Sequence, residues 1–211
     1  MIRAVSFASC YVYSPCGSCA ISERSRLLCA RLKAGDARLI FKYALRVRQQ
    51  ASEVPLLTGF FDASGILIPV PGSEPRDPEG VSVTERLAAA LVREGLGRCA
   101  WAGLRRVRAV RKSATAAGGE RPTVGKHYDS FAIDRADALS EPSHLILIDD
   151  VVTKGRTLLA AATRLHEAFP QARIRAFALL RTMGLIPGVD RLLDPCVGEI
   201  RWRAGDAHRN P

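Results

Sequence analysis

The sequence lacks any apolar run long enough to form a membrane helix. Its longest aliphatic stretches, Leu145–Ile148 and Leu158–Ala162, are far shorter than the roughly 18–20 residues that cross a bilayer. No hydrophobic segment follows the opening Met1-Ile2-Arg3, so an export signal is not predicted. Internal repeats and low-complexity tracts are also missing, which excludes fibrous architectures. We therefore expect a globular protein of the cytoplasm that does not bind membranes.

Size and composition fit an ordinary folded protein. The chain has 211 residues, of which 47% are hydrophobic and 25% charged. These values are close to the average for globular proteins and allow a sizeable core. The length corresponds to one large domain, or to one domain with a small appendage.

Positive charge is the most informative bulk property. Lys and Arg total 31 against 21 Asp and Glu, which gives a formal net charge of +10. Such a field attracts phosphate-bearing partners, among them nucleotides, sugar phosphates, nucleic acids and anionic lipids. Composition alone does not choose among these partners.

Apolar runs and helical patterns alternate along the chain. A short strand or hairpin is expected at Ala4–Tyr13, buried strands at Ile66–Val70 and Leu145–Ile148, and a further strand at Ile174–Leu180. Helices are expected from a cap at Ser22, over Ala37–Gln50, from a capping box at Ser82 and over Leu158–Phe169. Between them, Gly103–Ser130 is expected to form an irregular basic excursion. This alternation predicts an α/β fold with a mainly parallel sheet flanked by helices.

The N-terminal region concentrates the cysteines. Four of the six are Cys10, Cys16, Cys19 and Cys29. They contain a single Cys-x2-Cys spacing, whereas two such pairs would strongly indicate zinc, and Cys29 lies on the apolar stripe of its expected helix. In a reducing compartment we expect free thiols, with a zinc site on these four cysteines as the alternative.

The strongest local signal is the segment Leu145–Thr157. A buried strand ends in the paired carboxylates Asp149 and Asp150, and a short loop then leads into a helix. The free N–H groups and positive dipole of a helix N-terminus receive phosphate, while adjacent carboxylates suit vicinal sugar hydroxyls or the water shell of Mg²⁺. The segment thus predicts a phosphosugar site whose phosphate donors are Thr153, Lys154, Gly155, Arg156 and Thr157.

These residues resemble the phosphoribosyl pyrophosphate (PRPP) motif of the type I phosphoribosyltransferases. The resemblance implies that Asp149 and Asp150 hold the ribose hydroxyls, and Mg²⁺ through water, while residues 153–157 cradle the 5′-phosphate. A wider resemblance to the ComF-like (competence protein ComF) branch rests on Leu32-Lys33, on Ile68–Pro71 and on the Arg-rich middle that ends near Phe131.

The resemblance also implies an organisation and an activity. Residues 1–55 would form an N-terminal hood or appendage, and residues 56–211 the PRPP-binding domain. The expected reaction is Mg²⁺-dependent displacement of pyrophosphate from PRPP by a small-molecule acceptor, usually through a nitrogen. Dimers are common in this superfamily, which leaves a homodimer open. The candidate pyrophosphate-binding residues are Pro71, Gly72 and Ser73, with Arg111 and Lys112 as a lid over the leaving group.

The acceptor, the function and the role of one polar cluster stay open in the sequence. Hypoxanthine-type members carry a carboxylate at the position of Thr153, and its absence argues against a 6-oxopurine acceptor of that type. The alternative function is a ComF-like accessory protein of DNA uptake or processing, which would bind single-stranded nucleic acid and retain a PRPP site. For the cluster His127–Ser130 a structural turn is favoured over a catalytic role.

Overall fold

A single seven-stranded sheet forms the centre of the protein. The computed structural model describes residues 1–75, 80–110, 122–134, 142–184, 186 and 188–211. The strand order is β3-β2-β6-β7-β1-β8-β9, and β4 with β5 forms a separate two-stranded sheet. The strands are β1 (Ala4–Tyr13), β2 (Ile66–Pro69), β3 (Cys99–Ala100), β4 (Leu104–Arg106), β5 (Phe131–Ile133), β6 (His144–Val152), β7 (Arg173–Thr182), β8 (Leu193–Arg203) and β9 (Asp206–Asn210). The helices are α1 (Ala20–Lys33), α2 (Ala37–Glu53), α3 (Val83–Arg93), α4 (Val124–Ser130) and α5 (Arg156–Ala168).

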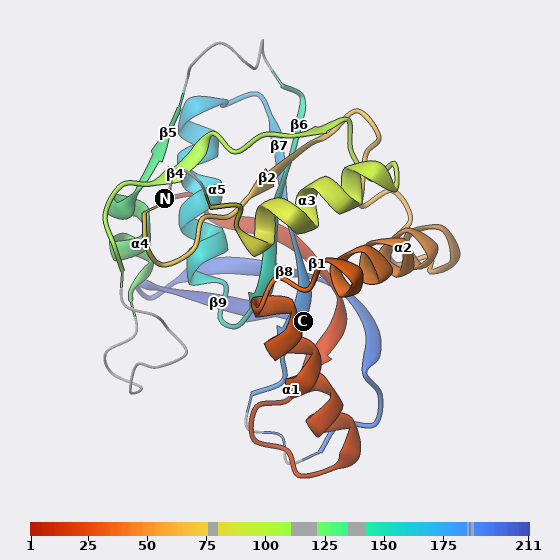
Figure 1. Ribbon diagram of the computed structural model, residues 1–211. Helices are drawn as coiled ribbons and strands as arrows, with labels where there is room; N and C mark the ends of the chain where they lie inside the picture. The colour runs from red at the N-terminus through yellow and green to blue at the C-terminus, as the bar shows by residue number, and fades with distance from the viewer. Residues whose placement is uncertain (76–79, 111–121, 135–141, 185, 187) are drawn as a thin grey trace.

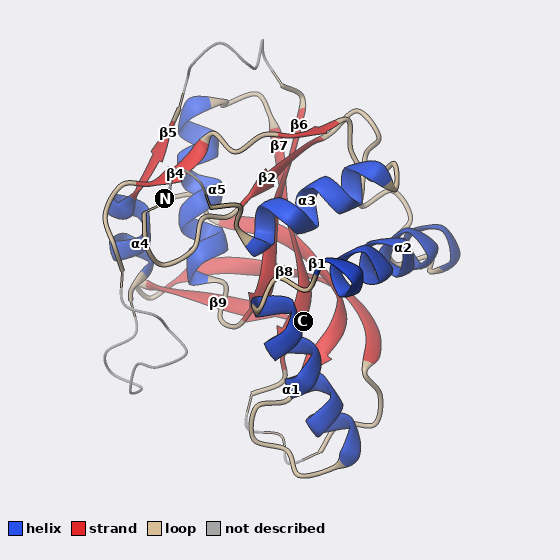
Figure 2. Cartoon of the chain, in the orientation of Figure 1, coloured by secondary structure: helices blue, strands red, loops and turns tan. Residues whose placement is uncertain are grey.

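Helices cover both faces of this sheet (Figures 1 and 2). The strands from β3 to β1 pair in parallel, and β8 and β9 add an antiparallel end. Strand β6 shows the division into two cores. Its Leu145 and Leu147 pack with α4 and α5, while Ile146 and Ile148 pack with α1, α2 and α3. Because successive side chains of a strand point to opposite faces, one continuous apolar run supplies both cores. The predicted α/β class is confirmed.

The sheet changes winding direction between β2 and β6. After β2 the chain passes through α3 to β3 on one side, and after β6 it passes through α5 to β7 on the other. The two helices belong to opposite cores. In open α/β sheets a crevice for ligands lies outside the carboxyl ends of the strands at such a switch point. A ligand site is therefore expected in the loops that follow β2 and β6.

Several sequence-based expectations need correction. Helix α1 begins at Ala20 with Cys19 as its N-cap, not Ser22, because the Cys19 sulfur accepts from the Ser22 N–H. Part of the expected irregular excursion is regular, since it contains β4 and α4. The hairpin of β8 and β9 was not predicted at all.

The first strand, which falls in the predicted N-terminal hood, belongs to the central sheet. Strand β1 lies inside the sheet between β7 and β8, so residues 1–55 contribute a strand of the central layer as well as α1 and α2. The division into residues 1–55 and 56–211 stays a prediction. Within the part of the chain that the structure describes, no helix combines the length and apolar character needed to cross a membrane.

Candidate functional site

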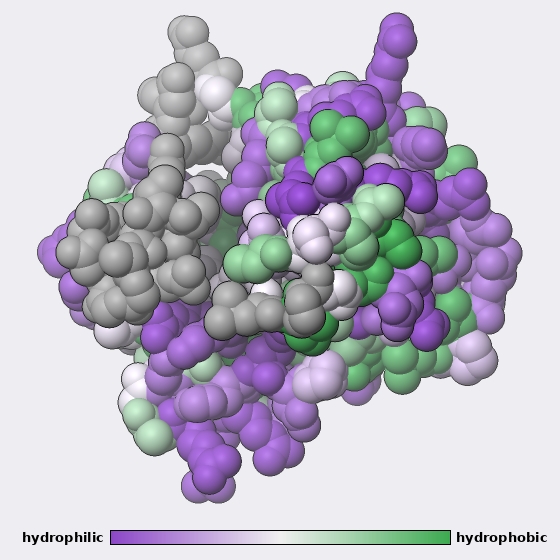
Figure 3. Space-filling view, turned by 90° about the horizontal axis from the view of Figure 1, so that it is seen from below, coloured by the Kyte–Doolittle hydropathy of each residue, from purple (hydrophilic) through white to green (hydrophobic). Residues whose placement is uncertain are grey.

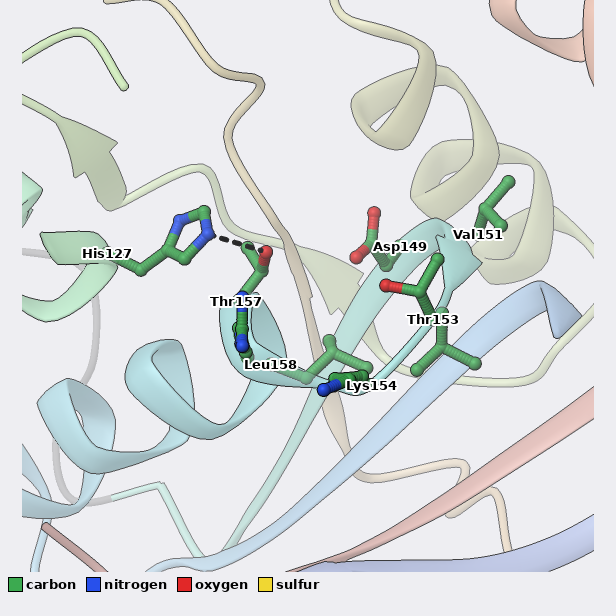
Figure 4. Close-up of a pocket in the computed structure, with 10 residues that line it drawn as sticks. His127, Asp149, Val151, Thr153, Lys154, Thr157 and Leu158 are labelled. Atoms are coloured by element: carbon green, nitrogen blue, oxygen red, sulfur yellow. Dashed lines mark hydrogen bonds between the residues drawn. The ribbon is translucent and has the colours of Figure 1, made fainter. Parts of the chain in front are cut away.

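The candidate site lies at the carboxyl ends of β2 and β6. These strands are parallel neighbours, with Pro69 of β2 paired to Ile148 of β6, so their following loops emerge at the same edge. The first loop carries Pro71–Ser73 and the second carries residues 153–155. A cavity at this edge is lined by Asp149, by residues 151–158 and by His127 of α4 (Figure 4). Asp149 and the predicted phosphate loop thus line one cavity, and α4 adds His127 to it.

Gly155 shapes the predicted phosphate loop between β6 and α5. It is the N-cap of α5 and has the left-handed backbone angle φ 85°, which glycine adopts without the penalty that a Cβ imposes. A Cβ at this position would lie 2.6 Å from Cδ1 of Ile200 in β8. The α5 cap has no side-chain hydrogen bond, so the first N–H groups of this helix face the cavity without a capping side chain.

The paired carboxylates form the acidic side of the site. Asp149 accepts a hydrogen bond from the Asp150 N–H at 2.9 Å, and Lys33 of α1 places its Nζ 3.9 Å from an Asp150 oxygen. Burial, together with the neighbouring Asp150 carboxylate, raises the pKa of Asp149 well above its usual range. Lys33 lies near Asp150 and Arg106 near Asp149, and the acceptor oxygens of the pair suit hydroxyl donors or a cation.

Arg156, predicted as a phosphate donor, lines the cavity and is bound by a carboxylate. Its Nε and Nη2 donate to the two carboxylate oxygens of Asp206 in β9, both at 2.6 Å. Lys154 also lies near this carboxylate, with 3.6 Å between its Nζ and Asp206 Oδ2. The bidentate pair fixes the start of α5 to the C-terminal hairpin, which the sequence did not reveal because the partners are fifty residues apart.

This ion pair is expected to stabilise the fold. The Arg156 hydrogen bond lowers the pKa of Asp206 to about 2. We expect Asp206→Asn to reduce the free energy of unfolding at neutral pH by about 1–2 kcal/mol. The carboxylate contributes only while it is ionised, so the deficit should be full above about pH 4 and disappear as the pH falls toward 2. Urea unfolding at several pH values measures it.

The control is Glu199→Gln, which removes an exposed ion pair with Arg201. Exposed pairs contribute little, so this variant should change stability by less than about 0.5 kcal/mol. Equal losses of unfolding free energy for the two variants would show that the Arg156–Asp206 pair stabilises the fold no more than an exposed ion pair does.

His127 is a site residue that the sequence did not assign. It is buried, and its Nε2 lies 3.5 Å from Oγ1 of Thr157 in the first turn of α5 (Figure 4). Burial, together with nearby Arg106 and Arg156, lowers the pKa of His127 to about 4. The ring is therefore neutral at physiological pH and holds the Thr157 hydroxyl as a positioning residue. The cluster His127–Ser130, expected to form a structural turn, belongs to helix α4. His127 is buried there and lines the cavity.

A neutral buried histidine makes stability depend on pH. Below about pH 6.5 the unfolded chain binds a proton at His127, whereas the folded protein does so only near pH 4. Stability should therefore fall by about 2–3 kcal/mol as the pH decreases across this window. We expect His127→Gln to flatten this part of a pH series of denaturant unfolding curves. The exposed His208→Gln should leave the slope unchanged, and identical slopes for all three proteins would contradict the assignment.

Arg106 anchors the loop after β2. This buried side chain donates to the carbonyl oxygens of Gly72 and Pro71, and also to the Ser130 hydroxyl. Its guanidinium lies over the Phe131 ring, 4.3 Å from the centroid. Burial lowers the pKa of Arg106 to about 10, while the nearby Asp149 carboxylate opposes that shift. Nothing in the sequence distinguishes Arg106 from the other arginines of its segment.

The remaining predicted residues are the two lid candidates and the four N-terminal cysteines. Arg111 and Lys112 lie outside the described residues. Cys10 and Cys29 are buried, whereas Cys16 is exposed. Cys19 is partly exposed, and hydrogen bonds to its sulfur, the Ser22 hydroxyl first among them, lower its pKa to about 7. Across the described ranges, no three His, Cys, Asp or Glu side chains are grouped to hold a metal ion.

Fold and site together define an α/β protein with a candidate phosphate-binding loop at a topological switch point. No family model matches the chain, and no curated protein matches it. Solved structures similar to it include a hypoxanthine phosphoribosyltransferase from Staphylococcus aureus, with 11% identity, a TM-score of 0.40 and coverage of 72% of this chain and 68% of that one. Another is a hypoxanthine phosphoribosyltransferase from Trypanosoma cruzi, with 13% identity, a TM-score of 0.31 and coverage of 79% and 72%.

Proposed function

We propose that this protein is a Mg²⁺-dependent phosphoribosyltransferase that binds PRPP. One observation carries the proposal. Asp149 and Gly155 line one cavity, Asp150 adjoins Asp149, and the loop Pro71–Ser73 leaves the neighbouring parallel strand at the same edge of the sheet. A sugar with a phosphate at one end and a pyrophosphate at the other needs acceptors for its hydroxyls between two sets of phosphate donors, and this edge offers that order of groups.

The 5′-phosphate would be held at the start of α5. The first N–H groups of the helix supply donors and a positive field. Thr153 and Thr157 add hydroxyls, and exposed Lys154 adds charge at the rim of the cavity. We assign Arg156 to fixing the loop instead, because its guanidinium is bound by Asp206.

The ribose would lie on the acidic strand end. Asp149 and Asp150 would accept from its two vicinal hydroxyls. The same carboxylates fit a magnesium site, because Mg²⁺ is usually bound by one or two carboxylates together with waters and substrate phosphates. When bound, Mg²⁺ would neutralise charge on the pyrophosphate group.

The reaction would exchange one bond at ribose C1 for another. The C1–O bond to pyrophosphate breaks, a bond to the acceptor nucleophile forms, and the acceptor releases a proton. The protein's contribution is positioning, since the leaving group departs with its electron pair and needs no covalent help. Arg106 would keep the loop of Pro71 and Gly72 in place beside that group. The acceptor stays unassigned.

A second candidate function is a ComF-like accessory protein that binds single-stranded nucleic acid. The net charge of +10 favours it, because phosphate backbones attract basic proteins. Figure 3 shows hydrophilic side chains over much of the described surface seen from below, with hydrophobic residues between them.

Calorimetric titration of PRPP in the presence of Mg²⁺ tests the proposal. We expect saturable binding, and ribose 5-phosphate should bind more weakly because it lacks the pyrophosphate group. No heat of binding for PRPP would contradict the proposed function. With binding established, release of pyrophosphate identifies the acceptor in a panel of candidates. Salt-dependent binding of single-stranded DNA that survives replacement of both aspartates would support the second candidate instead.

A further inference from the structure

A pair of cysteines lies away from the proposed PRPP site, at the beginning of α1. Cys16 and Cys19 are separated by Gly17 and Ser18. In Figure 1 this end of α1 points away from the sheet, while the other end carries Lys33 toward Asp150. The proposed transferase function leaves both thiols without a role.

The structure does not favour zinc at these thiols. Cys10 lies in β1 and Cys29 in α1, both buried in the core that contains Leu28 and Leu32. Within the described ranges no third ligand-type side chain completes a metal site for the pair. A structural zinc site needs four ligands, so a different chemistry is indicated.

The Cys19 sulfur accepts a hydrogen bond from the Ser22 N–H at 3.4 Å. Its other polar neighbours are the Ser22 hydroxyl at 3.2 Å and the Val189 carbonyl, to which the thiol donates at 3.6 Å. As the N-cap of α1, Cys19 lies at the positive end of the helix dipole. The Ser22 N–H and the helix dipole favour a thiolate, which is the nucleophilic form of cysteine.

A buried network holds the turn that presents the pair. The Ser22 hydroxyl donates to Ser14 Oγ at 3.0 Å, and the Ser14 N–H donates to Ser25 Oγ at 3.0 Å. Arg26 Nη1 donates to the Gly17 carbonyl at 2.6 Å. A Cβ on Gly17 would lie 2.2 Å from Ser22 Oγ, so glycine is required there. The turn is therefore fixed, with Cys16 exposed and Cys19 partly exposed.

We propose that Cys16 and Cys19 form a reactive dithiol site for exchange with low-molecular-weight disulfides. The Cys19 thiolate attacks one sulfur of the disulfide, forms a mixed disulfide and expels one thiolate. The Cys16 thiol then loses its proton and attacks Cys19, which closes an internal disulfide and expels the second thiolate. The protein is oxidised by two electrons, and the small disulfide is reduced to two thiols. This proposal does not depend on the transferase function.

The test treats the reduced full-length protein with oxidised glutathione and follows it by mass spectrometry. We expect a product that has lost two hydrogen atoms, with the cross-link in the peptide that contains Cys16 and Cys19. Cys16→Ser should stop at a mixed disulfide on Cys19. Cys19→Ser should slow exchange at this site at least about tenfold, because its thiolate is the attacking group.

The matched control is Cys99→Ser, which replaces a partly exposed cysteine on β3 and should react like the wild type. Unchanged thermal unfolding would show that each variant folds. Exchange at Cys19 no faster than at Cys99, or a purified protein that retains one zinc ion per chain at these cysteines, would overturn the proposal.

Discussion

The double variant Asp149→Asn with Asp150→Asn is expected to bind PRPP at least about a hundredfold more weakly than the wild type, since each hydrogen bond to a charged group contributes about 1.5–3 kcal/mol. The amides keep the size of the carboxylates but lose the negative charge that would hold ribose hydroxyls and Mg²⁺. Calorimetry measures the loss of affinity, and release of pyrophosphate measures the loss of activity.

The fold should tolerate the loss of these charges. Burial and the Asp150 carboxylate raise the pKa of Asp149, so its ionised form costs stability in the folded protein. Stability from this group is present below its unfolded pKa and is lost as the pH rises toward the folded value. We therefore expect Asp149→Asn alone to have a melting temperature at neutral pH equal to or above that of the wild type.

A variant that binds PRPP more weakly but unfolds at the same temperature identifies a binding residue rather than a structural one. The matched control is Asp190→Asn, an exposed acid outside the site, which should change neither property. If Asp149→Asn unfolds the protein, or if the double variant binds PRPP normally, the proposed role of the acidic pair is wrong.

Gly155→Ala is expected to lower the free energy of unfolding by about 2–4 kcal/mol and to abolish PRPP binding. Two effects add. The left-handed backbone at φ 85° costs an alanine about 1–2 kcal/mol, and the new Cβ would meet three side-chain carbons of Ile200 at 2.6–2.8 Å. The displaced loop would move the first N–H groups of α5 away from the phosphate.

Two further variants separate these contributions. Gly59→Ala introduces a Cβ at φ 73° with no atom within 4 Å, so it should show the backbone cost alone. Combining Gly155→Ala with Ile200→Ala removes the contact, and its loss should be smaller than the sum of the single losses. Denaturant unfolding compares these variants with Gly155→Ala, with Ile200→Ala alone and with the wild type. Strictly additive losses would contradict a steric clash between these residues.

Local patterns were enough to place most of the elements around the site. The expected strand Leu145–Ile148 lies within β6, the capping box of Ser82 and Glu85 is present, and Ala37–Gln50 lies within α2. These features depend on neighbours in the sequence, such as a side chain and an N–H three residues away. The short strands β3, β4 and β5 carry too few residues to show a period and were not predicted.

Contacts between distant segments were beyond the sequence. Asp206 binds Arg156, His127 meets Thr157, and Arg106 reaches the carbonyls of Pro71 and Gly72. No residue type or spacing marks such a pair, because its two members approach each other only after the sheet has formed. The sequence predicted Arg156 as a phosphate ligand, and it could not show that Asp206 binds this side chain because the two residues lie far apart in the chain.

The sequence by itself determined the α/β class and the order of groups from Leu145 to Thr157, since a buried strand, paired acids and a glycine before a helix are properties of consecutive residues. Only the tertiary structure decided what lies around these groups. Parallel pairing of β2 with β6 placed two loops at one edge, and the C-terminal hairpin supplied the carboxylate that holds Arg156. Such placements depend on long-range packing, whose free energy belongs to the assembled sheet rather than to any one segment.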